Sequence, residues 1–72
     1  MIEVFKTDIK EKIPAIRVIE GIHKSFTDHT ANIDLQDIDN ILRVECLNGS
    51  VATQQLLKFI EDYGHKAEVL EG

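Results

Sequence analysis

Alternating hydrophobic periods along this 72-residue chain predict a small α+β domain. Two segments repeat apolar residues every three or four positions, as amphipathic helices do. The short segments around them alternate apolar with polar residues or are β-branched and aromatic, as strands are. The order is β-α-β-β-α-β, which predicts a four-stranded antiparallel sheet with both helices on one face, in a single domain spanning residues 1–72.

The first strand is expected over residues 2–7, and a helix is expected from Lys12 to about Phe26. Pro14 lacks an N–H and fits only the first turn, which places the helix start near Glu11 or Lys12. Gly21 is expected to permit close packing of this helix on the sheet. The apolar positions expected on or beside its buried face are Ile13, Ala15, Ile16, Val18, Ile19, Ile22 and Phe26.

The middle of the chain predicts a β-hairpin. Apolar residues alternate with polar ones over residues 31–35 and again over residues 42–46, and residues 37–40 between them have turn chemistry. The side chain of Cys46 is expected to point into the core, where a thiol behaves as a small hydrophobic group. The polar partners in this alternation predict an open outer face of the sheet that carries Asn32, Asp34, Arg43 and Glu45.

The last third of the chain predicts a helix and a short strand. Ser50 is expected to cap a helix that continues through Tyr63, and Gly64 is expected to end it in a left-handed conformation. Ala67 and Val69 alternate with charged residues in the final strand. Right-handed crossovers would put strands one and three at the centre of the sheet and strands two and four at its edges, which is the ferredoxin-like arrangement.

Composition narrows the function classes. The single cysteine excludes an internal disulfide and suits a reducing compartment. We expect a cytoplasmic protein, because the chain shows neither a secretory signal nor an apolar run of membrane-spanning length. The net charge of −5 repels phosphate backbones and anionic lipids, so we expect no nucleic-acid or membrane partner and favour a protein partner with a basic surface.

The chain resembles a known family over nearly its whole length. Asp34-Leu35 followed by Ile41-Leu42-Arg43-Val44, and then residues 56–69 (LLKFIEDYGHKAEV), are similar to the heavy-metal-associated domain of copper chaperones and metal-transport ATPases. The resemblance implies the ferredoxin-like fold. The family holds Cu(I) with a Cys-x-x-Cys motif in the loop before the first helix, where this chain has residues 8–12 (DIKEK). We therefore expect a member whose soft-metal thiolate site is lost, with no metal and no cofactor.

The same loop remains the candidate binding surface, with Asp8, Glu11, Lys12 and His65 as candidate site residues. The resemblance places His65, just after the glycine of the second helix, near this loop. An imidazole with carboxylates can hold Zn²⁺ weakly, whereas the neighbouring lysines oppose a cation. The other two histidines, His23 and His29, are expected to be scattered, solvated surface residues.

Three functions are left open. The first is a non-enzymatic binding or interaction module, because no nucleophile and base pair stands out. The second is metal handling with altered ligands, in which His65 acts with Asp8 or Glu11. The third is a small-molecule sensor that dimerises through sheet edges or helices. The sequence sets no oligomeric state.

Overall fold

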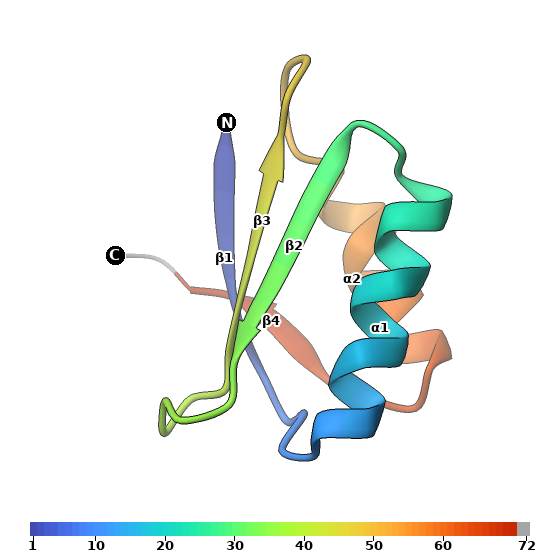
Figure 1. Cartoon of the computed structure of the whole chain (residues 1–72). Coiled ribbons are helices and arrows are strands. Elements are labelled where there is room, and N and C mark those ends of the chain that lie inside the picture. Colours follow the sequence, from blue (N-terminus) through green and yellow to red (C-terminus); the bar gives the residue numbers. More distant parts are fainter. Residues whose placement is uncertain (71–72) are drawn as a thin grey trace.

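A computed structural model of the chain describes residues 1–70, so residues 71–72 of the expected domain lie outside the described part. Its elements follow the predicted β-α-β-β-α-β order (Figure 1). Among residues 1–70 no helix is long and apolar enough to cross a lipid bilayer. The elements are β1 (Ile2–Thr7), α1 (Lys12–Ser25), β2 (His29–Asp34), β3 (Ile41–Cys46), α2 (Thr53–Asp62) and β4 (Ala67–Val69).

The four strands form one antiparallel sheet in the order β2-β3-β1-β4, and both helices cover the same face of it (Figure 1). This confirms the predicted ferredoxin-like fold, with the first and third strands at the centre. The register pairs Phe5 with Leu42 between β1 and β3, and Ala31 with Val44 between β2 and β3. Directly paired residues share a face of the sheet, so the apolar positions of these strands meet the helices.

The core lies between the sheet and the two helices, and Cys46 is buried, as predicted. The opposite face carries the polar alternation, including the pair Asn32 and Arg43 and the pair Thr30 and Glu45. The fully buried side chains of the core are Phe5, Ile9, Val18, Ile22, Leu42, Val44, Leu56 and Ile60.

Helix α1 begins where Pro14 predicted, with Glu11 as its N-cap residue. Its buried side is narrower than expected, because Ile13 is 65% exposed and Ile16 is 42% exposed. Ala15, Val18 and Ile22 form the buried stripe. At about 3.6 residues per turn, Ile13 points nearly half a turn away from that stripe, so the expectation that it packs on the sheet is wrong.

Gly21 allows a close approach between the two helices, rather than between α1 and the sheet as expected. A Cβ atom at this position would lie 2.6 Å from Cζ of Phe59 and 2.8 Å from the hydroxyl oxygen of Tyr63. Phe59 also packs edge-on against Phe26, with ring centroids 5.8 Å apart. Phe59 and Tyr63 of α2 therefore pack against Gly21, the one position of α1 that lacks a side chain.

Helix α2 begins two residues later than the sequence suggested. It starts at Thr53 with Ala52 as N-cap, so Ser50 does not cap it, and the Ser50 hydroxyl instead lies 3.7 Å from the Met1 sulfur. The hydroxyl of Thr53 donates to the carbonyl oxygen of Val51 at 3.3 Å, which stabilises the turn before the helix. At the other end Gly64 has φ +86°, the left-handed conformation that was predicted.

Candidate functional site

A groove runs beside β4 at one end of the sheet. Its volume is about 860 Å³, and it lies between α2 and the strands β1 and β4. Three lysines and three carboxylates line it, so its formal charge with neutral histidine is zero. The lining residues are Lys6, Thr7, Asp8, Gln54, Leu57, Lys58, Glu61, His65, Lys66, Ala67 and Glu68.

Asp8 joins the loop after β1 to the loop before β4. Its backbone N–H donates to the carbonyl oxygen of Lys66 at 3.2 Å, and its carboxylate accepts the Lys66 N–H at 2.9 Å. The same carboxylate oxygen lies 3.3 Å from Nδ1 of His65. The structure thus brings together Asp8 and His65, two of the four candidate residues, on the groove wall.

Glu11 and Lys12, the other two candidates, stand apart from this pair. They form the first positions of α1, and within residues 1–70 neither lines the groove. The side chain of Glu11 makes no capping hydrogen bond to α1. The four-residue candidate site therefore divides into a pair in the groove and a pair at the start of a helix.

The loop before α1 is fastened to the core by Thr7 and Ile9. The Thr7 hydroxyl donates to the carbonyl oxygen of Asn40 at 2.7 Å and accepts the Ile9 N–H at 3.2 Å. Ile9 itself is completely buried and belongs to the core cluster. The resembling family carries its thiolate motif in this loop. In this chain the loop instead buries the aliphatic side chain of Ile9 in the core.

Within residues 1–70, no hydrogen bond occupies the outer backbone edge of β4. Leu70 donates its N–H to Val4, and Lys66 accepts the N–H of Asp8, so both residues direct their backbone toward β1. Alternation along a strand then turns the N–H and C=O of Ala67 and Val69 away from β1, and Ala67 also lines the groove. A row of unpaired strand groups of this kind can accept another strand.

The opposite edge of the sheet, on β2, is protected by a side chain. The outward N–H of Ala31 donates to Nε2 of His23 at 3.0 Å, from the last turn of α1. His23 is exposed as predicted, yet its imidazole acts as a structural acceptor. The β2 edge therefore has one backbone donor fewer to offer to a further strand.

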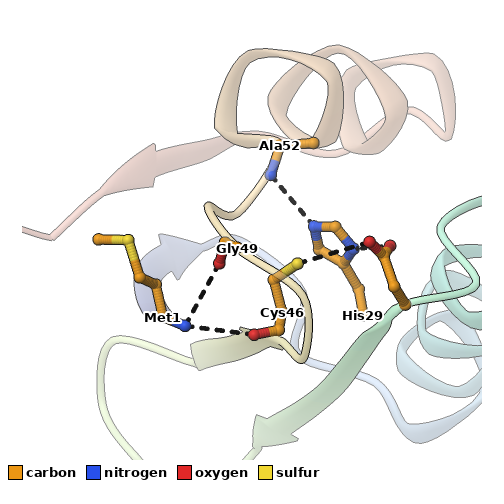
Figure 2. A network of polar contacts seen from close by, with 6 residues as sticks. Met1, His29, Cys46, Gly49 and Ala52 are labelled. Carbon is orange, nitrogen blue, oxygen red and sulfur yellow. Dashed lines mark hydrogen bonds and ion pairs between the residues drawn. The ribbon is translucent and has the colours of Figure 1, made fainter.

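A second cluster lies at the far end of the sheet from the groove, where β2 begins and β3 ends (Figure 2). His29 is only 6% exposed, which corrects the expectation of a solvated loop residue. Its Nδ1 lies 2.8 Å from Oδ1 of Asp28, and the Cys46 thiol donates to Oδ2 of the same carboxylate at 3.6 Å. Asp28 therefore accepts from both neighbours.

The hydrogen bonds assign the proton on the His29 ring. Nε2 accepts the backbone N–H of Ala52 at 3.1 Å, so the ring proton lies on Nδ1 and points at Asp28. The hydrogen bond from His29 is the main reason why the pKa of Asp28 falls below its usual value of 3.8. Asp28 is thus ionised at neutral pH, and His29 links β2 to the start of α2.

Sequence reasoning missed this cluster because it treated His29 as part of a loop. The signal that could have found it is the hairpin register: with Asp34 opposite Ile41, counting outward puts His29 opposite Cys46. Both positions then lie on the inward face, where a histidine needs polar partners.

Comparisons with known proteins do not test the resemblance to the heavy-metal-associated domain. Neither the protein-family models nor the curated proteins nor the solved structures contain a significant match to this chain. Membership in the heavy-metal-associated family stays a prediction that rests on the quoted residues.

Proposed function

We propose that this protein is a non-enzymatic binding module that takes up an extended segment of a protein partner as an additional strand beside β4. The observation that carries the proposal is the groove of about 860 Å³ that is lined by Ala67 and Glu68, beside a backbone edge of β4 that has no hydrogen-bond partner within residues 1–70. Addition of a strand to an exposed sheet edge supplies affinity through main-chain hydrogen bonds. Pockets beside that edge then supply selectivity.

The lining of the groove fits an extended peptide with mixed side chains. Leu57 and Ala67 offer apolar contact for residues that face the helix side. Lys58 and Glu61, one turn apart on α2, offer one charge of each sign. Because the whole chain carries −5, a basic segment would reach the groove faster than an acidic one, and this advantage would shrink with added salt.

The contacts of the loop before α1 support a role in protein binding. Ile9 is buried in the loop that carries the thiolate pair in the resembling family, and Asp8 is already bonded to the Lys66 backbone. These contacts fasten the loop to the core and to the start of β4. The groove therefore has a preformed wall, which lowers the ordering cost of binding.

The proposal is tested with peptides selected from a random-sequence display library and measured by calorimetry. We expect binding to slow hydrogen exchange at the Ala67 and Val69 amides. Ala67→Pro removes an outward N–H donor without touching a bond to β1, and it is expected to weaken binding at least about tenfold, which corresponds to about 1.4 kcal/mol. The matched control, Ala67→Gly, keeps that N–H and should bind within a few-fold of the wild type.

Two outcomes would contradict this function. One is a peptide that binds Ala67→Pro as tightly as the wild type while circular dichroism shows both proteins folded. The other is a dimer in light scattering that Ala67→Pro dissociates, since the edge would then belong to a second copy of the chain.

Metal handling at the groove is the second candidate, and one observation favours it. Nδ1 of His65 and the carboxylate of Asp8 lie 3.3 Å apart, close enough to share one ion. Anaerobic titration with Zn²⁺ and Cu(I) against a competing chelator tests this candidate. Submicromolar binding that His65→Ala abolishes would favour it over peptide binding.

A further inference from the structure

We propose that Asp28, His29 and Cys46 form a binding site for a zinc-class divalent metal ion, at the end of the sheet opposite the groove (Figure 2). The inference is independent of the proposed peptide binding. It uses none of the groove residues, and it lies far from the loop in which the resembling family would hold its metal.

The backbone places the three donor atoms together. Cys46 donates its N–H to Met1 and not to β2, so His29 and Cys46 form a non-hydrogen-bonded antiparallel pair, the kind whose side chains approach most closely. Asp28 is held next to them because its carbonyl oxygen accepts the Leu47 N–H at 2.9 Å. One ligand atom from each of the three side chains lies within 4.8 Å of the others.

The donor chemistry selects the class of ion. A thiolate, an imidazole nitrogen and a carboxylate oxygen are the ligands that zinc binds in proteins, whereas Mg²⁺ and Ca²⁺ require oxygen ligands. Three protein ligands leave a fourth tetrahedral position open. The Asp28 side chain is 44% exposed, which gives an ion a path to the two buried ligands.

The surrounding charges agree with a cation at this place. Two hydrogen atoms point at the Asp28 carboxylate, one from Nδ1 of His29 and one from the Cys46 thiol, and an ion would replace both. The thiol proton leaves to solvent, and a Zn²⁺ ion with one thiolate and one carboxylate is then neutral overall. The Met1 amino group contacts the carbonyl oxygen of Cys46, on the side away from the sulfur (Figure 2).

Metal binding has a structural consequence at α2. When Nδ1 ligates an ion, the ring proton moves to Nε2, which can then no longer accept the Ala52 N–H. The residues before Thr53 must adjust, and the amide of Ala52 loses its protection. The ion and the start of α2 are thus coupled through one imidazole.

Anaerobic titration with Co²⁺ tests the site, because cobalt bound to a thiolate gives a charge-transfer absorption. We expect this absorption in the wild type, its displacement by Zn²⁺, and faster hydrogen exchange at Ala52 in the zinc form. Cys46→Ser should abolish the absorption, and Asp28→Asn should weaken binding at least about tenfold. The control His65→Ala removes the groove imidazole and should leave the titration unchanged.

Asp28→Asn also guards against misfolding, because Asp28 is the least buried of the three ligands. Zinc should in addition slow the reaction of the Cys46 thiol with a disulfide reagent in the folded wild type. The site would be refuted by Co²⁺ binding without thiolate absorption, by no binding, or by a titration that His65→Ala abolishes. The last result would favour metal handling at the groove, so the titration also distinguishes this site from the second candidate function.

Discussion

Replacing Ile9 by alanine is expected to lower the free energy of unfolding by about 2–5 kcal/mol. Ile9 is completely buried although it belongs to a loop, and it fastens that loop to the core cluster. The substitution removes apolar contact and leaves a cavity that the two ends of the loop, held by Thr7 and α1, cannot easily close. Urea denaturation followed by circular dichroism measures the loss.

Ile13→Ala is the matched control, because it deletes the same atoms four residues away. Ile13 is 65% exposed, so its loss should change the free energy of unfolding by less than about 0.5 kcal/mol. A second effect is expected only for Ile9→Ala, namely faster hydrogen exchange at the Asp8 amide, which bonds to Lys66. Equal losses for both variants would show that the helix buries the side containing Ile13.

Gly21→Ala is expected to destabilise the protein by about 1–2 kcal/mol, although alanine is the better helix former. The new methyl group would lie 2.6 Å from Cζ of Phe59, closer than packed atoms can approach. Overpacking of this kind costs about 1–3 kcal/mol, and the gain in helix propensity returns up to about 1 kcal/mol. Thermal unfolding should show a midpoint lower by roughly 4–16 °C.

A double-mutant cycle identifies the clash as the cause. In a Phe59→Leu background the far end of the ring is gone, and the half-exposed Tyr63 side chain can turn outward. Gly21→Ala should then be neutral or stabilising. If the alanine destabilises both backgrounds equally, the aromatic contact is not why glycine is required at this position.

The order and type of the elements could be predicted because each segment has a clear hydrophobic period. The hairpin was especially well determined: alternation over residues 42–46 oriented Leu42, Val44 and Cys46 toward the core, where the structure has them. The buried side of α1 was less certain, because isoleucines occur around half of the helix. Only packing against the sheet selects the stripe of Ala15, Val18 and Ile22.

Only one part of the candidate site, the contact between Asp8 and His65, could be predicted from the sequence. Asp8 and His65 lie in loops at one end of the sheet, and the topology alone brings those loops together. The contact between His29 and Cys46 depends on strand register, which a shift of one residue would have reversed. The bond from Ala52 to His29 depends on where α2 begins, and Ser50 had suggested an earlier start.

The imidazole of His23 over the Ala31 N–H limits how copies of this fold can associate. A sheet with two unprotected edges can extend indefinitely, because each added chain presents a new edge to the next chain. Two copies of the chain that pair through their β4 edges would leave only β2 edges at the outside, and on each of these the Ala31 N–H is already bonded to His23. Pairing along β4 therefore favours a closed pair of copies over a growing fibre.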